Sequence, residues 1–462
     1  MSLYREGYKT ITSIEGPLIF VQGIKEAGFG EMVTIETPDG LRQGQVLQVD
    51  GDISVIQVFD GTSGLDTKNV TIWLERDVIK VPVGMGMKGR LFNGRGQPLD
   101  GRPLSLIEEF RAVNGFTINP ACRTSPNNFI ETGISTIDLM NTLVRGQKLP
   151  VFSGPGMPAN QVAAQLVENA TIPGRESSFL VVFAAMGITT READYFIESF
   201  KRSGAINNGV FFMNLASDSA VERLLTPRMA LTVAEYYAFE KDLDVLVILT
   251  DMLYYCESLR EISAAREEVP GRRGFPGYLY SDLSEIYERA GCVRGKSGSI
   301  TQIPVITMPN DDMTHPVADL SGYITEGQIV LDRDIYEKAG FPPVNVLPSL
   351  SRLMNKGIGT GKTFEYHRQM ADQLYASYAR SRELYRLKLV VGDEGLNVTE
   401  HKYLAFGDKF ERLFINQSSN RRSLEESLSM AWECLSELPD KELYRLPEKH
   451  ILSNRDNIFA NE

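Results

Sequence analysis

The sequence predicts a multidomain α/β protein in which a small N-terminal β-barrel precedes a central α/β domain and a C-terminal helical bundle. Three observations predict this order. Short β-branched segments with turn residues between them fill positions 1–75. Apolar strands alternate with amphipathic helices through 76–360, and apolar residues at helical spacing dominate 361–462. A chain of 462 residues is also too long for one compact core.

The N-terminal segment has the pattern of a small closed barrel. Strands are expected at ISVIQVF (53–59) and VTIWL (70–74), with Asp-Gly and Pro-Asp-Gly turns around them. The region 84–103 is dense in Gly and Pro, which predicts a linker followed by hairpins.

The central domain is predicted from continuous apolar strands, because such strands lie in parallel sheets that are covered on both faces. The expected strands are 149–153, 179–186, 209–215 and 245–249, and the expected helices include 160–170 and 220–240. Three amphipathic helices are expected after residue 360. Their aromatic side chains are predicted to pack in the core and between subunits: Tyr375, Tyr378, Tyr385, Tyr403, Phe406, Phe410 and Phe414.

The composition disfavours several functional classes. The net charge of −12 disfavours a nucleic-acid binder, which gains affinity by neutralising phosphates with Lys and Arg. We expect neither a membrane span of ~18 apolar residues nor a signal peptide. The four Cys form no CxxC pair and lie far from the His residues, which predicts free thiols in a reducing cytoplasm and no metal site.

A phosphate-binding loop is expected between the first core strand and its helix, but its chemistry is missing. Such a loop has the pattern GxxxxGK[ST]: backbone N–H groups cradle phosphates, Lys reaches them and Ser/Thr holds magnesium. When the pattern is aligned from Gly154, with Gly156 inside the loop, its last three positions fall on Ala159, Asn160 and Gln161. Pro155 and Pro158 also remove backbone donors. By itself this segment is equally consistent with an ordinary strand–helix turn.

A second GKT lies at 361–363, in Gly-Ile-Gly-Thr-Gly-Lys-Thr. The residue five before Gly361 is Lys356 where the pattern needs Gly, and the preceding segment is not an apolar strand. We therefore predict that this segment is not a phosphate loop.

Segments along nearly the whole chain resemble the B subunit (beta chain) of archaeal and bacterial V/A-type ATP synthases. The central domain would then be RecA-like, with a degenerate P-loop. The segments that carry the resemblance include TGISTID, NTLVRGQKLP, FAAMGIT, LTPRMALTVAEY, VLVILTD, LREISAARE, VPGRRGFPGY, SDLSEIYERAG, DLSGYITEGQI and LPSLSRLM.

The resemblance implies a non-catalytic, regulatory subunit of a rotary machine that couples ATP synthesis or hydrolysis to ion transport. Three such subunits would alternate with three catalytic A subunits around a central rotor, and the barrel would close the ring and meet the peripheral stalk. The chain would hold no cofactor of its own, with ATP or ADP and magnesium at the interface with the catalytic subunit. It would lie at the cytoplasmic face of the cell membrane and reach the membrane only through the complex.

The resemblance also implies the loss of a catalytic carboxylate. Catalytic relatives carry a Gly-Glu-Arg motif whose Glu positions the attacking water. Matching Gly187 to that Gly places Ile188 at the Glu position and Thr189 at the Arg position. The magnesium-site Asp of catalytic relatives falls on Thr250, with Asp251 one residue later.

Two arginine-bearing segments have roles implied by the resemblance. The motif Ser-Leu-Ser-Arg would send Arg352 into the neighbouring subunit's ATP site as an arginine finger. The turn 269–278 would face the rotor, with Arg272 and Arg273 presented after Pro270 and Gly271. Without the resemblance, an ordinary ion pair is the better explanation of Arg352, and a solvated basic turn explains 269–278 equally well.

Two other functional classes are open to the sequence. One is an autonomous P-loop ATPase that uses the segment 357–363. The other is a hexameric nucleic-acid translocase of related fold, against which the acidic charge and the lack of a basic or aromatic RNA-binding signature argue.

Overall fold

The structure is a computed structural model that describes residues 7–24, 26–115, 117–338 and 340–453. The chain divides into two compact units. The first unit comprises 1–117, 181–241 and 249–289, and the second unit comprises 118–180, 242–248 and 290–462. The predicted succession of strands, alternating strands and helices, and then helices is confirmed.

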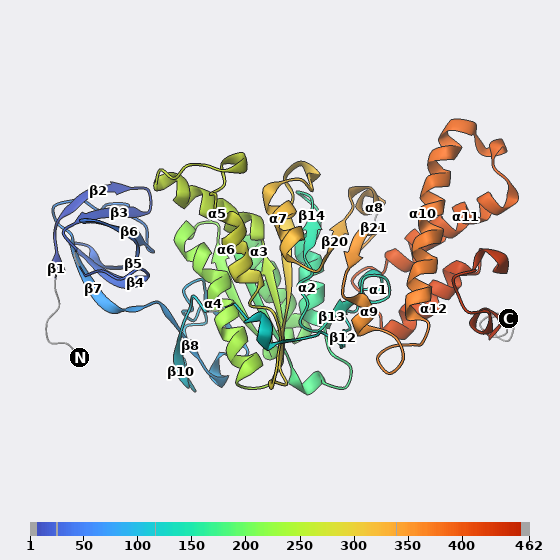
Figure 1. The fold of residues 1–462 in the computed structure, drawn as a ribbon, viewed down its shortest axis with the longest axis horizontal. Helices are drawn as coiled ribbons and strands as arrows, with labels where there is room; N and C mark the ends of the chain where they lie inside the picture. Colours follow the sequence, from blue (N-terminus) through green and yellow to red (C-terminus); the bar gives the residue numbers. More distant parts are fainter. Residues whose placement is uncertain (1–6, 25, 116, 339, 454–462) are drawn as a thin grey trace. The chain divides into compact units, whose positions relative to one another are not determined.

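Seven antiparallel strands form the N-terminal barrel of the first unit (Figure 1, blue). Their hydrogen-bonded order is β1-β7-β4-β5-β6-β3-β2, and its two end strands are joined by only Lys9 and Thr10. Alternate residues of β4 point inward, so that Val33 and Ile35 are fully buried. The strands are β1 (Gly7–Tyr8), β2 (Ile11–Glu15), β3 (Leu18–Gln22), β4 (Glu31–Thr37), β5 (Gly40–Asp50), β6 (Ile53–Val58) and β7 (Thr71–Val78).

Parallel strands with helices packed on them make up the rest of the first unit. β16 is buried along nearly its whole length, pairs in parallel with β15 and β9, and is covered by α3 and α4. These elements are β9 (Arg90–Asn93), β15 (Phe179–Ile188), β16 (Gly209–Leu215), α3 (Thr190–Ser203), α4 (Ala220–Phe239), α5 (Met252–Ala265) and α6 (Leu279–Tyr287). A two-stranded ribbon adds β8 (Lys80–Val83) and β10 (Glu109–Ala112).

The expectation of a linker and hairpins at 84–103 is only partly right. The chain does fold back after β9, since the Leu99 N–H donates to the Leu91 carbonyl at 2.9 Å. However, β9 is also a strand of the parallel sheet, because Phe92 lies opposite Phe212 of β16. A four-residue strand among glycines has too little periodicity to predict, and its partner is distant in the sequence.

The second unit is built around β14, which lies between two parallel neighbours. Val151 is opposite Val305 of β19 on one side and Ile329 of β20 on the other. β21 continues the sheet antiparallel to β20. The principal elements are β14 (Val151–Ser153), α2 (Ala159–Asn169), β17 (Asp244–Thr250, which ends in the first unit), β19 (Ser299–Thr307), α7 (Pro316–Ile324), β20 (Gly327–Leu331), α8 (Arg333–Glu337) and β21 (Val344–Ser351).

Short pieces of structure flank these elements in the second unit. They are β11 (Arg123–Thr124), β12 (Phe129–Ile130), α1 (Ser135–Asp138), β13 (Leu143–Val144), β18 (Gly291–Val293) and α9 (Met354–Gly357).

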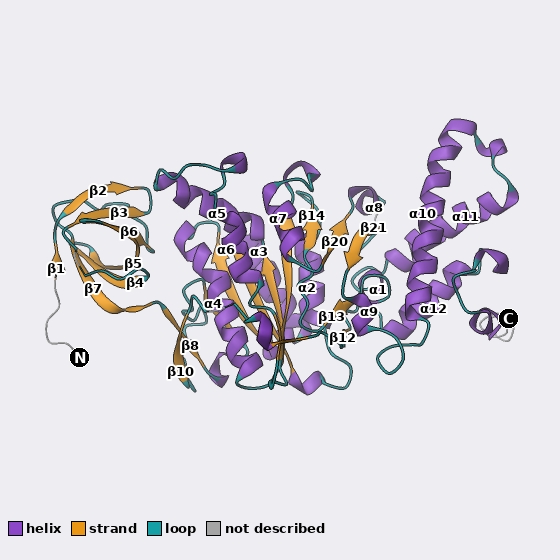
Figure 2. Ribbon diagram, viewed as in Figure 1, coloured by secondary structure: helices purple, strands orange, loops and turns teal. Residues whose placement is uncertain are grey.

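The C-terminal part of the second unit is helical from residue 367 onward in its described residues (Figure 2). Its helices are α10 (His367–Val391), α11 (Val398–Lys409), a π-helix (Phe410–Ile415) and α12 (Leu424–Leu435). Phe406, Phe410 and Phe414 stack in succession, with ring centres 5.6 and 4.9 Å apart. The predicted packing role of the aromatics is therefore confirmed for these rings. Tyr375 differs, because 45% of it is exposed.

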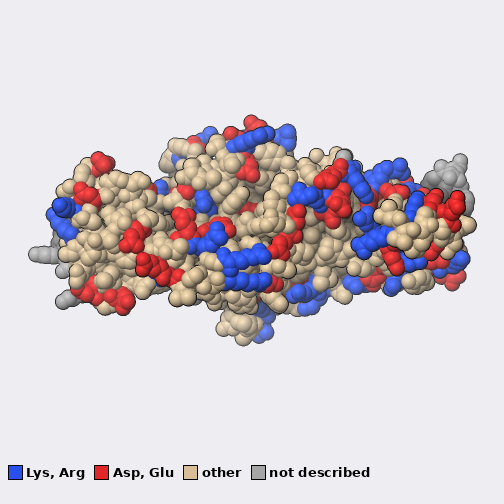
Figure 3. Space-filling model, turned by 90° about the horizontal axis from the view of Figure 1, so that it is seen from above, with Lys and Arg blue, Asp and Glu red and all other residues tan. Residues whose placement is uncertain are grey.

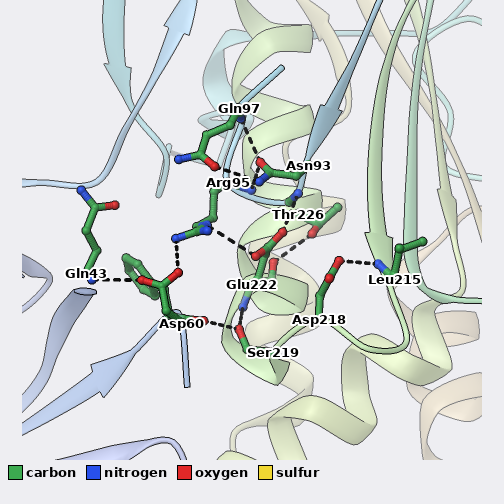
Figure 4. Close-up of polar contacts among 12 residues, drawn as sticks. Gln43, Asp60, Asn93, Arg95, Gln97, Leu215, Asp218, Ser219, Glu222 and Thr226 are labelled. Atoms are coloured by element: carbon green, nitrogen blue, oxygen red, sulfur yellow. Dashed lines mark hydrogen bonds and ion pairs between the residues drawn. The ribbon is translucent and has the colours of Figure 1, made fainter. Parts of the chain in front are cut away.

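A polar junction joins the barrel to α4 within the first unit (Figure 4). Arg95 Nη1 lies 2.7 Å from the Asp60 carboxylate, and Arg95 Nε lies 3.4 Å from the Glu222 carboxylate. Ser219 Oγ donates to the Phe59 carbonyl at 2.6 Å. Burial raises the pKa of Glu222 above its ordinary value. Arg95 therefore compensates a carboxylate whose side chain is only 9% exposed.

We predict that Arg95→Ala lowers the free energy of unfolding by about 3 kcal/mol, because it leaves the buried Glu222 carboxylate without its cation. Urea unfolding of the purified chain measures the loss. Lys80→Ala is the matched control, since it removes an exposed ion pair with Asp77 and is expected to have little effect. Equal losses in the two variants would contradict the prediction.

Candidate functional site

The loop between β14 and α2 has the strand–loop–helix context of a phosphate-binding loop. β14 ends at Ser153 and α2 begins at Ala159. Asn160 and Gln161 lie in the first turn of α2, where a phosphate loop carries its Lys and its magnesium hydroxyl. The structure therefore places the predicted loop residues in the expected order, without the side chains that bind phosphate.

The backbone of this loop has few free N–H donors. Pro155 and Pro158 have none. The Met157 N–H donates to the Gly154 carbonyl at 3.2 Å, and the Ala159 N–H donates to the Met157 carbonyl at 2.8 Å. Because an anion cradle needs convergent N–H groups, these internal bonds remove donors that a phosphate would use.

A carboxylate lies directly against the loop. A Cβ atom added at Gly154 would stand 1.7 Å from Asp311 Oδ1, so any larger residue here would require the Asp311 side chain to move. Arg333 pairs with Asp311 at 3.0 Å and also donates to the Pro155 carbonyl at 3.0 Å. The Asp311–Arg333 ion pair therefore lies directly beside the loop. The sequence analysis missed Asp311 and Arg333, which come from distant segments and match no motif.

The segment Gly187–Thr189 lies in the first unit at the end of β15. Gly187 has φ +66°, and an added Cβ would lie 2.9 Å from Tyr254 Cβ. Ile188 is 2% exposed and belongs to the core. Thr189 caps α3 and forms a capping box with Glu192. Neither Ile188 nor Thr189 therefore offers a group that could orient or activate water.

Thr250 and Asp251 lie at the junction of β17 and α5. Thr250 ends the strand and is 1% exposed. Asp251 follows it as the cap of α5, and its carboxylate accepts the Leu253 N–H at 2.8 Å. The first carboxylate after the strand is thus Asp251, and at least part of it serves to cap the helix.

Arg352 is an exposed residue directly after β21, on the wall of a groove of about 520 Å³. Its Nη1 atom donates to the Thr325 carbonyl at 3.3 Å. Among the residues that the structure describes, no carboxylate pairs with Arg352. The groove also has polar walls from Asn141, Gln328, Ser349, Arg368 and Tyr375.

Arg352 and the loop after β14 lie at opposite edges of the same sheet. Phe152 lies opposite Val330, so the loop follows the carboxyl end of parallel strands. Ser351 lies opposite Gly327, so Arg352 is at the amino end of β20. Six residues of extended chain, about 20 Å, separate the two positions. Arg352 therefore cannot reach the loop of its own unit.

The turn after α5 presents two exposed arginines, as predicted. The Gly271 N–H donates to the Phe275 carbonyl at 2.7 Å, which closes the turn. Arg272 and Arg273 are exposed, and Arg273 has φ +52°. Arg260 packs over the Phe275 ring, 5.4 Å from its centre, and anchors the turn on α5.

Family models match three successive parts of the chain. A model of the ATP synthase alpha/beta family beta-barrel domain matches residues 11–72, and the family's nucleotide-binding domain matches 133–351. The C-terminal domain of V and A type ATP synthase matches 356–455. The V-type ATP synthase beta chains of two strains of Thermus thermophilus are 54% identical over 459 residues, which cover 98% of this chain and 96% of theirs.

The chain belongs to the V-type ATP synthase beta-chain family. A solved structure described as a unique ATP synthase subunit, NeqB from Nanoarchaeum equitans, is similar with a TM-score of 0.74 and 37% identity. It covers 92% of this chain and all of that one. The resemblance inferred from the sequence is thus confirmed, as is the fold class of barrel, nucleotide-binding domain and helical domain.

The second GKT belongs to the helical domain, since it lies inside the match to the V/A C-terminal model. It follows α9 rather than a strand. Thr363 Oγ1 accepts the Gly359 N–H at 2.8 Å and bonds His367 Nδ1 at 3.0 Å. His367 Nε2 bonds the Leu139 carbonyl at 2.9 Å. Thr363 therefore links this loop to α10 by hydrogen bonds and is not placed to hold magnesium.

The described residues hold neither a candidate membrane span nor a candidate metal site. No helix there is both long and apolar enough to cross a membrane. No group of three or more His, Cys, Asp or Glu side chains there is arranged to hold a metal ion.

We predict an acid-sensitive contribution to stability from His367. Burial lowers its pKa to about 4, below the ordinary 6.5, so the folded protein favours the neutral ring. This stability is complete above pH 6.5 and is lost as the pH falls toward 4. His367 should therefore make the chain roughly 2 kcal/mol less stable at pH 5 than at pH 7, measured by urea unfolding.

The His367→Phe variant should lack this part of the pH dependence. His401 is exposed, so His401→Gln serves as the matched control and should keep the wild-type dependence. An unchanged pH dependence in His367→Phe would show that other groups cause the acid sensitivity.

Proposed function

We propose that this chain is the non-catalytic, regulatory subunit of a rotary V/A-type ATP synthase. It alternates with catalytic A subunits in a hexameric ring and helps to couple ATP synthesis or hydrolysis to ion transport. The observation that carries the proposal is the loop after β14, which has lost Lys and Ser/Thr and has Asp311 against Gly154. A site of this kind does not support nucleotide hydrolysis by the chain alone.

In this proposal Arg352 completes the ATP site of a neighbouring catalytic subunit. Its guanidinium is exposed, and no carboxylate among the described residues neutralises it. Its position at the sheet edge opposite its own loop keeps it away from that loop, which supports a role at a neighbour's nucleotide. A guanidinium there stabilises charge on the transferring phosphoryl group. ATP or ADP with magnesium would lie at that interface, bound by the partner.

The proposal also covers the partner subunits, the cellular location and the domain boundaries of the chain. The turn with Pro270, Gly271, Arg272 and Arg273 contacts the central stalk, and the barrel meets the peripheral stalk. The chain reaches the cytoplasmic face of the cell membrane only through the complex. The chain divides in this proposal into a barrel (1–75), a nucleotide-binding-fold domain (76–360) and a helical domain (361–462).

Two other functions have weaker support. An autonomous ATPase would need a phosphate loop, and the 357–363 segment has its Thr363 engaged with His367. A nucleic-acid translocase would need a basic surface, but on the face shown in Figure 3 basic and acidic side chains are interspersed without a continuous basic band. The net charge of −12 also disfavours it.

We predict that Arg352→Ala leaves assembly with the catalytic subunit intact and lowers ATP turnover by about 10³-fold or more, because it removes an arginine finger. Arg352→Lys should also fail substantially, since a point charge lacks the planar fork. The measurements are size-exclusion chromatography of the mixed subunits and steady-state ATP hydrolysis by the assembled complex.

The exposed Arg412, on the π-helix of the same unit, provides the matched control. Arg412→Ala should hydrolyse ATP at the wild-type rate. Normal turnover by an assembled Arg352→Ala complex would overturn the proposed role. ATP turnover by the isolated chain would favour the autonomous enzyme.

We predict that reversing both charges in Arg272→Glu/Arg273→Glu weakens binding of the central-stalk subunits by about tenfold, because the turn would then repel acidic groups. Quantitative pull-down of the stalk by the assembled ring measures this. Lys201→Glu/Arg202→Glu, at the exposed end of α3, is the matched control with the same charge change. Equal stalk binding by both double variants would argue against the contact.

A further inference from the structure

We propose that the ion pair between the buried Lys148 and the partly exposed Glu326 positions Arg352 for its role in the neighbouring site. This inference rests on the proposed function, because it assigns residues that act through the arginine finger. Neither residue touches a nucleotide in this proposal. Both are positioning residues that fix the place of the Arg352 backbone, from which the guanidinium extends.

Lys148 holds Glu326 at several points. The Lys148 ammonium lies 2.9 Å from Glu326 Oε1, and the Lys148 N–H donates to Glu326 Oε2 at 2.8 Å. The Glu326 N–H in turn donates to the Lys148 carbonyl at 3.0 Å. The Lys148 side chain is only 4% exposed and the Glu326 side chain is 29% exposed, so the contact is partly buried. The residue before β20 is therefore fixed to the chain that leads into β14.

Glu326 in turn holds Arg352. The Arg352 N–H donates to the Glu326 carbonyl at 3.0 Å, and Arg352 Nη1 donates to the adjacent Thr325 carbonyl at 3.3 Å. Thr325 is itself tied to α7 through its hydroxyl, which donates to the Ser321 carbonyl at 2.7 Å. Both the backbone and the guanidinium of Arg352 are thus anchored on residues 325 and 326, which Lys148 fixes.

Gln147 extends the same anchor to the end of β21. Its amide Nε2 donates to the Glu326 carbonyl at 2.9 Å and to Ser351 Oγ at 3.0 Å. Ser351 Oγ donates to the Thr142 carbonyl at 2.8 Å. Adjacent residues, Gln147 and Lys148, therefore contact the segment before β20 and the residue that precedes the arginine.

The polar chemistry of this pair favours a positional role over a stabilising one. Replacing a buried ion pair by apolar side chains of similar size is often neutral or stabilising, because desolvation offsets the attraction. What an ion pair with several directed hydrogen bonds adds is a single defined geometry. Here that geometry is the alignment of the start of β20 with the end of β21, where Arg352 emerges.

A small displacement at this point matters for catalysis. An arginine finger acts by geometry, and a misplacement of about 1 Å can cost about 10²-fold in rate. Arg352 lines the groove, and its guanidinium donates a hydrogen bond to the Thr325 carbonyl. The position of the strand ends therefore sets the reach of the guanidinium.

The test uses Lys148→Met/Glu326→Gln in the ring assembled with the catalytic subunit. This double substitution removes both charges of the ion pair together, and the amide oxygen of the introduced glutamine can still accept the backbone N–H at position 148. We expect normal assembly and thermal unfolding, a kcat for ATP hydrolysis reduced at least tenfold, and a KM for magnesium-ATP within about twofold of wild type. Lys449→Met/Glu365→Gln removes an exposed ion pair of the same unit and should leave kcat unchanged.

A second arm adds Arg352→Ala to the Lys148→Met/Glu326→Gln background. If the pair acts through the arginine, the combined variant is no slower than Arg352→Ala alone, because the effects are not additive. Multiplied losses, or a wild-type kcat in the pair variant while Arg352→Ala is inactive, would overturn the positioning role and leave the proposed function standing. Normal turnover in Arg352→Ala would overturn both.

Discussion

Burial of the parallel strands on both faces is the constraint on which the arrangement of this protein depends. The side chains of β14, β16 and most of β19 are buried, so the strands contribute packing and hold no exposed chemistry. Polar groups that could act on a ligand are left to the loops at the strand ends. The loop after β14, the end of β15 and the residue after β21 are such positions, and they determine what the chain can do.

The two edges of the sheet differ in what their polar groups do. At the carboxyl end of β14, side chains that would hold phosphate are absent, and the backbone bonds within itself. At the amino end of β20, a partly buried ion pair and a glutamine order the chain around Arg352. The loop at one edge of the sheet thus lacks the side chains that hold phosphate in a P-loop, while the opposite edge carries the exposed cation of Arg352.

Much of this could be predicted from the sequence, because long apolar strands and amphipathic helices leave strong periodic signals. The strand predicted at 209–215 is β16 with the same bounds, and the loss of chemistry at Ala159, Asn160 and Gln161 is visible by alignment alone. The parallel pairing of β9 was not predictable, because four residues among glycines carry no usable period. Asp311 and Lys148 could not be assigned either, since their contacts join segments that are distant along the chain.

Arg352 and the loop after β14 lie at opposite edges of the sheet, so the two edges of the nucleotide-binding fold are chemically different. One edge carries the arginine, and the other carries the loop at which a nucleotide would bind. In the proposed ring, such units would associate head to tail, so that each interface would join unlike surfaces and the closed ring would have a single sense of rotation. In the proposed ring of two alternating subunit types, one type lacks the phosphate-binding side chains of this loop. Every second interface would then be inactive in ATP hydrolysis. The number of working sites is then set by subunit composition, without any change in the symmetry of the fold.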